Sequence, residues 1–326
     1  MAAMTPPTSP PPPRPHRRAV RQLLLGLVPL LVVGLVLLVA LALRLGDVRA
    51  PLAADTATAT ATVTAVGTAP DGRGLDVSFT DADGTPRTGV VELERALDVP
   101  VGAELAVRYD PDDPADATRV HTDGDAASAA VSDVVFGLLA VTVVLLAATA
   151  LTAARLLGRP RLRSRPALRL TATHVVVRRG LLVRSWLEVD TSAGLRWLPV
   201  HWAPELDRLV PGARIEVRGD PARDRLVLPV VEGAEVWPSG RVRDREPRGE
   251  LRQAAVDPAA TEVGLARQAR ADGVLPFLAP VLGLLWSYVD GSGPLGFLAA
   301  TALSAAVLFW LPQLLGSDPR ASSHQA

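Results

Sequence analysis

Long uncharged runs of apolar residues constrain this 326-residue chain more than any other feature. Residues 23–43, 134–154 and 295–315 each provide 21 consecutive positions without a charge. An α-helix rises 1.5 Å per residue, so each run is roughly 31 Å long and can cross a hydrocarbon core of about 30 Å. A shorter run, residues 274–289, is followed by Asp-Gly-Ser-Gly and then a full-length run, which favours a hairpin of two spans. The pattern predicts four transmembrane helices.

The first run could instead belong to a signal peptide, because the arginines at positions 17, 18 and 21 lie just before it. However, 21 residues exceed the 7–15 apolar residues typical of a signal peptide, and Arg44 follows directly. We therefore interpret the run as an uncleaved membrane anchor.

Arginine placement orients the chain. Residues 1–22 carry four Arg and no acidic residue, and residues 158–273 carry 21 Arg against 15 acidic residues, a net charge of +6. Residues 46–133 carry 6 Arg against 17 acidic residues, a net charge of −11. Because arginine-rich flanks stay in the cytoplasm, the counts predict a multi-pass plasma-membrane protein whose N-terminus and C-terminus are both cytoplasmic.

The two segments between the spans have the pattern of short strands. Threonines at positions 56 to 64 alternate with Ala or Val, and residues 75–79 and 168–177 also alternate. Alternation of β-branched and polar residues, interrupted by Gly and Asp-Pro turns, predicts antiparallel β-domains that are barrel-like or sandwich-like. The two segments align at an offset of 110 residues, where Gly102, Asp110 and Pro111 match Gly212, Asp220 and Pro221. We interpret this match as an internal duplication.

These patterns together give the domain organisation. The predicted parts are a disordered Pro/Arg-rich cytoplasmic tail (1–22), the first span (23–45), an extracytoplasmic β-domain (46–131), the second span (132–156), a cytoplasmic β-domain (158–248), a juxtamembrane helical segment (249–272), the third span (274–289), the fourth span (294–315) and a cytoplasmic tail (316–326).

Four short phrases resemble known membrane proteins. The outer β-domain ends in V-R-Y-D-P-x-x-P, residues 107–114. This signature resembles a family of uncharacterised bacterial membrane proteins with a small β-domain between two spans, and the resemblance covers residues 20–157. The C-terminal half is similar to uncharacterised four-span proteins of high-GC bacteria, through the phrases at residues 196–202, 237–241 and 316–319. The resemblance implies the architecture and a membrane location, and it implies no activity.

The absence of Lys and Cys excludes several chemistries. Without Cys there are no disulfides, thiolate zinc sites or cysteine nucleophiles. Residues 81–85 read D-A-D-G-T, a string found in haloacid-dehalogenase-type phosphatases. Those enzymes also use a lysine, and their nucleophile follows a buried parallel strand, whereas the strand before Asp81 alternates with polar residues. We therefore interpret the string as a hairpin turn.

An acidic cluster is the candidate metal site. Asp110, Asp112 and Asp113 offer the hard oxygen ligands that Ca²⁺ prefers. The cluster lacks the Gly and the distal Glu of an EF-hand loop, and its two prolines favour a rigid turn on a solvated face. A weak cation site and a plain turn remain the two interpretations.

The inner segment contains the candidate ligand-binding residues, which are Arg196, Trp197, His201, Trp202 and Glu205. His201 and Glu205 have the four-residue spacing of a helical zinc site, but the proline at position 204 prevents a helix from running through both. The aromatic residues could line a ligand groove or contact anionic lipid headgroups. They could equally fill a small β-domain core.

The sequence therefore favours a non-enzymatic interaction or scaffolding module of the cell envelope. The expected partners are the lipid bilayer, a protein partner on either face and anionic headgroups at the inner face. Nucleic acid is not expected, because Arg alternates with acidic residues. No cofactor is implied. The alternative is a membrane-bound hydrolase or small-ligand binder that uses the Trp-rich cytoplasmic β-domain.

Overall fold

The computed structural model describes residues 16–69, 71–95, 98–116 and 120–320. The chain divides into two compact units, one formed by Met1–Val33 with Leu145–Ala326 and the other by Gly34–Val144. The division falls inside two long helices, α1 (Arg17–Ala54) and α2 (Ala126–Gly158).

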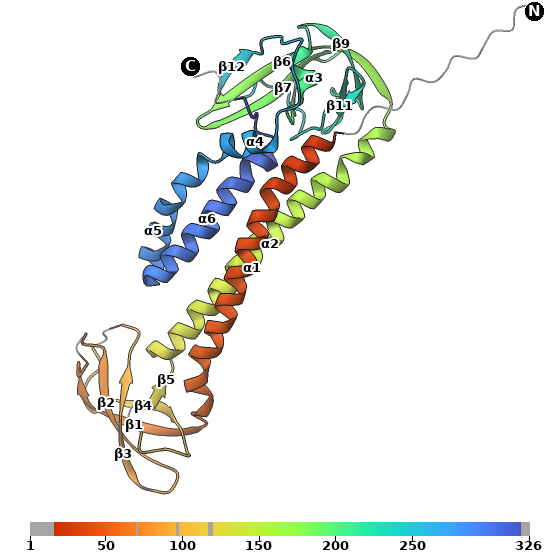
Figure 1. Cartoon of the computed structure of the whole chain (residues 1–326). Coiled ribbons are helices and arrows are strands. Elements are labelled where there is room, and N and C mark those ends of the chain that lie inside the picture. The colour runs from red at the N-terminus through yellow and green to blue at the C-terminus, as the bar shows by residue number, and fades with distance from the viewer. Residues whose placement is uncertain (1–15, 70, 96–97, 117–119, 321–326) are drawn as a thin grey trace, which may run out of the picture. The chain divides into compact units, whose positions relative to one another are not determined.

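The described residues contain four helical stretches that are long and apolar enough to cross a membrane. Three of them are α1, α2 and α6 (Gly293–Leu315). The fourth is a series of α4 (Leu265–Asp272), the 3-10 helix η2 (Leu275–Leu278) and α5 (Ala279–Asp290). The predicted hairpin is present, because α5 and α6 lie side by side in Figure 1 and only a short turn separates them.

Many large apolar side chains of these helices are exposed. Leu35, Leu139, Leu146, Leu284 and Leu298 each expose 60% or more of their surface. Isolated exposed apolar residues are ordinary on a soluble protein, but continuous apolar helix surfaces are typical of contact with lipid or with a partner.

One unit contains a five-stranded antiparallel sheet in the order β3-β2-β1-β4-β5. Its strands are β1 (Ala57–Val66), β2 (Gly74–Thr80), β3 (Pro86–Glu92), β4 (Glu104–Tyr109) and β5 (Val120–Thr122). One face packs a core that includes Val63, Val77, Phe79, Val107 and Tyr109. The threonines of β1 from Thr58 to Thr64 are exposed on the other face, as the alternation predicts.

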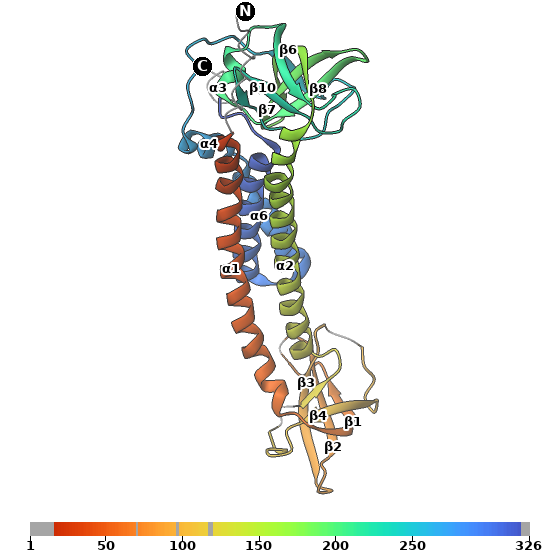
Figure 2. The ribbon, with the colours of Figure 1, turned by 90° about the vertical axis from the view of Figure 1, so that its right-hand side faces the viewer.

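The other unit contains a seven-stranded antiparallel sheet in the order β11-β10-β9-β6-β7-β8, with β12 paired to β6. Its elements are the 3-10 helix η1 (Pro160–Ser164), β6 (Ala167–Arg179), β7 (Leu182–Thr191), β8 (Gly194–Val200), α3 (Pro204–Arg208), β9 (Ala213–Arg218), β10 (Leu228–Val231), β11 (Ala234–Glu235) and β12 (Glu250–Gln253). Its main core includes Leu187, Leu198, Leu206, Val217 and Val236. Figure 2 shows these strands at the same end of the unit as the beginning of α1.

The two sheets connect their strands in the same way. Strands β1 to β5 lie in the order 3-2-1-4-5, and β6 to β10 repeat this order, because β8, β7, β6, β9 and β10 are successive neighbours. The turns after β4 and β9 also agree. The N–H of Asp112 donates to Asp110 Oδ1 at 2.9 Å, and the N–H of Ala222 donates to Asp220 Oδ1 at 2.9 Å. These pairs are 110 residues apart, which is the offset of the sequence match.

The predicted helical segment of residues 249–272 differs from the structure. Within residues 249–272, only α4 is helical, and Glu250–Gln253 form β12 instead. Leu251 of β12 packs against the cluster of Val175 and Trp186, so pairing with β6 outweighs a weak helical pattern that a proline interrupts.

The terminal segments also differ in part. Residues 17–22 of the predicted N-terminal tail form the first turns of α1, and residues 317–320 continue from α6 into contacts with β7. The predicted tails at residues 1–15 and 321–326 lie outside the described residues.

Helices α1 and α6 approach each other closely at Gly26. A Cβ atom on Gly26 would lie 2.9 Å from Cβ of Gln313 and 3.1 Å from Cα of Trp310. Trp310 also donates from Nε1 to Thr152 Oγ1 of α2 at 3.1 Å. Helix α6 therefore contacts both long helices, and Figure 2 shows it between them.

We expect Gly26→Ala to destabilise the protein by about 1–3 kcal/mol, because the added methyl group forces α1 and α6 apart. Gly46→Ala is the matched control, since a Cβ atom at that position of the same helix meets no atom within 4 Å. Ala is the better helix former, so the control should gain about 0.5–1 kcal/mol. Thermal unfolding of both full-length variants in detergent measures the difference. Equal melting temperatures would contradict the close contact.

Candidate functional site

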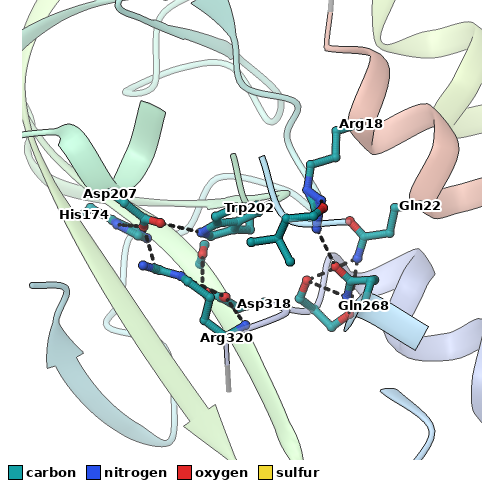
Figure 3. Close-up of polar contacts among 11 residues, drawn as sticks. Arg18, Gln22, His174, Trp202, Asp207, Gln268, Asp318 and Arg320 are labelled. Carbon is teal, nitrogen blue, oxygen red and sulfur yellow. Dashed lines mark hydrogen bonds and ion pairs between the residues drawn. The ribbon is translucent and has the colours of Figure 1, made fainter. Parts of the chain in front are cut away.

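Seven buried polar side chains gather where α1, α4 and α6 meet the β-domain of the seven-stranded sheet. We call this group the polar layer, and it consists of Arg18, Gln22, His201, Gln268, Asp272, Gln313 and Ser317. Each of these residues exposes 6% of its surface or less. Part of the polar layer is drawn on the right of Figure 3. Buried polar groups are costly unless they are hydrogen-bonded, so their pairing decides whether this arrangement is stable.

The carboxylate of Asp272 is the acceptor at the centre of the polar layer. Its Oδ2 atom accepts hydrogen bonds from Nε2 of Gln268 at 2.7 Å, from Nε2 of Gln313 at 2.6 Å and from Oγ of Ser317 at 2.9 Å. The donors come from α4, from α6 and from the residues just after α6. One carboxylate at the end of α4 therefore joins this helix to the end of α6.

Helix α1 joins the same group through two side chains. Arg18 donates to Oε1 of Gln268 at 2.9 Å and to the carbonyl oxygen of Val263 at 2.9 Å. Gln22 donates from Nε2 to Oγ of Ser317 at 3.2 Å, and its Oε1 lies 3.3 Å from Nδ1 of His201. Burial lowers the pKa of His201 well below its ordinary value, so this imidazole is neutral at pH 7.

Trp202 lies between two guanidinium groups. The Cζ atom of Arg18 is 4.5 Å from the centre of the indole, and that of Arg320 is 5.4 Å from it. The indole Nε1 donates to Oδ2 of Asp207 at 3.0 Å, and Arg320 forms an ion pair with Oδ1 of Asp207 at 2.5 Å. Figure 3 shows Trp202 between Asp207 and Arg18, with Arg320 below. These contacts connect the end of the chain and the start of α1 to the β-domain.

Asp207 and His174 are both buried in this region. Nδ1 of His174 lies 3.6 Å from Oδ1 of Asp207. Burial raises the pKa of Asp207 to about 7, although the charge of Arg320 opposes the shift. Burial lowers the pKa of His174 to about 4, so His174 is neutral at pH 7.

The five candidate ligand-binding residues have separate surroundings. Trp197 packs with the cluster on β6 and β7, and Arg196 donates to the carbonyl oxygen of Leu195. His201 and Trp202 are fully buried in the contacts described above. Glu205 pairs with Arg208 at 3.5 Å and lines a cavity of about 320 Å³ beside the start of α1. The structure brings Trp202 and His201 together at the polar layer and leaves Arg196 apart from them.

The three phrases of the C-terminal half meet in space. The N–H of His201 donates to the carbonyl oxygen of Trp237 at 2.8 Å. A Cβ atom on Gly316 would lie 2.6 Å from Cβ of Ser239 and 3.2 Å from Nδ1 of His201. Gly316 adopts a φ of +75°, so both its backbone conformation and the lack of space favour glycine.

Sequence reasoning missed most of the polar layer. Gln22, Gln268 and Gln313 are single glutamines near the ends of apolar segments, and neither spacing nor a motif links them. The one available signal is that Gln22 and Gln313 stand at the ends of predicted spans, where a polar side chain needs a partner, and that Gln268 precedes a predicted span by six residues.

The candidate cation site and the phosphatase-like string both form turns. Asp110 accepts the backbone bond from Asp112, and Asp112 and Asp113 are exposed. Across the described part of the chain, no three His, Asp or Glu side chains gather as metal ligands. Asp81 accepts the N–H of Thr85 at 2.8 Å, and this bond, together with the ion pair to Arg87, lowers its pKa. The cation site stays a prediction.

A second buried cluster lies in the unit of residues 34–144. Nδ1 of His121 is 2.8 Å from Oδ2 of Asp125, and its Nε2 is 3.3 Å from Oδ2 of Asp55. Asp125 also accepts the N–H of Ser128 at the start of α2, and Asp55 directly follows α1. The hydrogen bond to Asp125 raises the pKa of His121. Burial alone would raise the pKa of Asp125, but the bonds from His121 and Ser128 outweigh burial and lower it.

Comparison of the chain with protein-family models, with curated proteins and with solved structures found no match.

We expect Gln268→Leu to reduce the free energy of unfolding by about 3 kcal/mol, because it removes the acceptor of Arg18 and a donor to Asp272 in a buried site. Gln253→Leu makes the same chemical change at an exposed position of β12 and should change stability by about 0.5 kcal/mol or less. Chemical unfolding of the full-length protein in detergent compares the two variants. Similar losses would mean that the polar layer contributes little.

His121 should make stability depend on pH. Because its pKa is raised in the folded protein, its stabilising contribution is complete below the ordinary His value near pH 6.5 and is lost as the pH rises through the folded value. The lowered pKa of Asp125 acts in the opposite sense, so its contribution is lost in acid. Melting temperature measured from pH 5 to pH 9 should fall in the wild type and fall less in His121→Gln. Parallel profiles would contradict the assignment.

Proposed function

We propose that the protein is a non-enzymatic, multi-pass scaffold of the plasma membrane that displays one small β-domain on each side. The polar layer is the observation that carries this proposal. Its buried polar side chains are joined to one another, and they join α1, α4 and α6 to the inner β-domain. A domain attached in this way moves with its membrane helices, which suits a platform that holds partners at the bilayer.

The orientation is part of the proposal. The net charges of −11 and +6 on the two β-rich segments support an outer location for residues 46–133 and an inner location for residues 158–273. The exposed face of the outer sheet, with the threonines of β1 at its centre, offers a surface for a protein partner. Its acidic surroundings suit a cationic or cation-bridged partner.

We also propose that the two β-domains arose by internal duplication. The shared strand order and the equivalent turns at Asp110 and Asp220 support this view. The inner copy adds β11 and β12. We also propose that the chain is related to the uncharacterised bacterial four-span proteins that it resembles. This proposal concerns architecture and membrane location only.

The alternative function, a hydrolase or small-ligand binder, needs Arg196, His201 and Glu205 to act on one ligand. Their side chains contact different partners, which are a backbone carbonyl, Gln22 and Arg208. We therefore favour the scaffold.

Labelling of single cysteines tests the orientation, because the natural chain contains no Cys. Thr60 and Ser192 are exposed positions on the two β-domains, so Thr60→Cys and Ser192→Cys provide a matched pair. A membrane-impermeant maleimide should label Thr60→Cys in intact cells and Ser192→Cys only after lysis. The reverse pattern, or labelling of both in intact cells, would overturn the proposed topology.

The same variants test the scaffold function. A thiol-linked photocrosslinker at Thr60→Cys should give discrete protein adducts in native membranes, because a scaffold is occupied by its partner. Asp83→Cys, at the exposed tip of the β2–β3 turn, is the control and should give fewer adducts. The neighbouring Gly84 is unsuitable, because its positive φ would strain a cysteine. Adducts at neither Thr60 nor Ser192 would count against an interaction module.

A further inference from the structure

A cavity of about 580 Å³ lies on the inner β-domain at the end of α6. Leu182, Arg184 and Trp186 line it, and because they alternate along β7 they share one face of that strand. Leu315, the last residue of α6, also lines the cavity. Backbone contacts fix this end of the helix, since the N–H of Asp318 donates to the carbonyl oxygen of Val183 at 2.9 Å. The cavity therefore begins where a membrane-length helix ends.

The segment of residues 243–249 forms the opposite wall. Two backbone hydrogen bonds of 2.9 Å join Arg243 to Trp197 of β8. The segment then reaches β6, where Glu250 pairs with Arg178. Because β7 lies between β6 and β8, the segment crosses the face of β7. Strand pairing at both ends holds this wall in place.

The lining is strongly basic. It contains five arginines against two acidic residues, Asp244 and Glu246, a net charge of +3. Throughout the described ranges, none of these five arginines forms an ion pair, whereas Arg163, Arg165 and Arg208 of the same unit each pair with a carboxylate. The five are Arg179, Arg184, Arg243, Arg245 and Arg248.

Two of these guanidinium groups face one aromatic ring. The Cζ atoms of Arg184 and Arg243 are 5.1 Å and 5.2 Å from the centre of the Trp186 indole. Arg184 donates to Oγ of Ser239 at 3.0 Å, but its Nε and the indole Nε1 of Trp186 have no acceptor among the described residues. Burial, together with the charges of Arg243 and Arg155, lowers the pKa of Arg184 to about 10. Two like charges and two donors thus lie together without a carboxylate partner among the described residues.

We propose that this cavity binds the phosphate headgroup of an anionic phospholipid. Guanidinium groups form paired, charge-assisted hydrogen bonds with phosphate oxygens, and the volume lies within the range of small-molecule sites. Leu182 and Leu315 provide apolar lining at the end of the helix, where the glycerol and acyl chains of a lipid would leave the site. Anionic lipids are enriched in the cytoplasmic leaflet. The lipid source rests on the membrane orientation proposed above.

Binding to the purified full-length protein in non-ionic detergent tests the site. The probes are a short-chain phosphatidylglycerol, the zwitterionic phosphatidylcholine of the same chain length, and inorganic phosphate. Native mass spectrometry counts the lipids retained, and a titration gives the affinity. The wild type should retain phosphatidylglycerol over phosphatidylcholine, and inorganic phosphate should compete weakly.

Two triple variants separate a defined site from general attraction. The first replaces the exposed cavity arginines Arg243, Arg245 and Arg248 by Gln. The second makes the same change in net charge at the exposed residues Arg169, Arg214 and Arg223, which do not line the cavity. We expect about tenfold or greater loss of phosphatidylglycerol affinity in the first variant and less than about twofold loss in the second. Elution volume and melting temperature show that both are folded.

Each other outcome overturns the proposal. Equal losses of phosphatidylglycerol affinity in both triple variants would show diffuse electrostatic attraction. An unchanged affinity in the first variant would show that the cavity does not bind the lipid. Inorganic phosphate that binds as tightly as the lipid would assign the site to a soluble anion. The experiment is independent of the cysteine labelling, because detergent binding does not require a particular topology, so failure of one proposal is distinguishable from failure of the other.

Discussion

The buried carboxylate of Asp272 is the constraint on which the unit with the seven-stranded sheet depends. An isolated ionised carboxylate is costly to bury, so it must be surrounded by donors. Gln268, Gln313 and Ser317 supply them, and Arg18 and Gln22 extend the group to α1. A shift of any one helix would leave a donor or an acceptor without its partner. The polar layer therefore sets where the helices end relative to the seven-stranded β-domain.

Arginine serves this chain in ways that lysine would not. At Trp202 and at Trp186, two guanidinium groups lie near one indole ring, because a planar, weakly hydrated cation can stack on an aromatic face. The two stacks differ in their counter-charge. Asp207 pairs with Arg320 beside Trp202, whereas the arginines beside Trp186 have no carboxylate partner in the described part of the chain. The first stack is structural, and the second is the basis of the proposed anion site.

The two β-domains share a strand order but differ in what their surfaces contact. In the unit of residues 34–144, the core includes Tyr109, whose hydroxyl accepts the N–H of Ala82, and the threonines of β1 are exposed on the other sheet face. In the other unit, β8 follows the first hairpin and leads into His201 and Trp202, which contact α1. The same strand order can therefore leave a sheet surface exposed or hold a domain against helices. The difference depends on the side chains that follow β8 in one domain and β3 in the other.

The sequence by itself determined most of the local structure, but it missed β12, which depends on pairing with the distant strand β6. Uncharged runs of 21 residues predicted three of the long helices, and the alternating threonines predicted β1. The Asp-Gly pair predicted the turn at Gly84, because glycine readily adopts the positive φ that the turn requires. It could not determine the polar layer, since Arg18 and Gln268 are 250 positions apart and no periodicity relates them. Only the tertiary structure decided that pairing. Local conformation follows from neighbouring residues, whereas a buried polar group takes whichever partner the packing of distant helices and strands brings within hydrogen-bond distance.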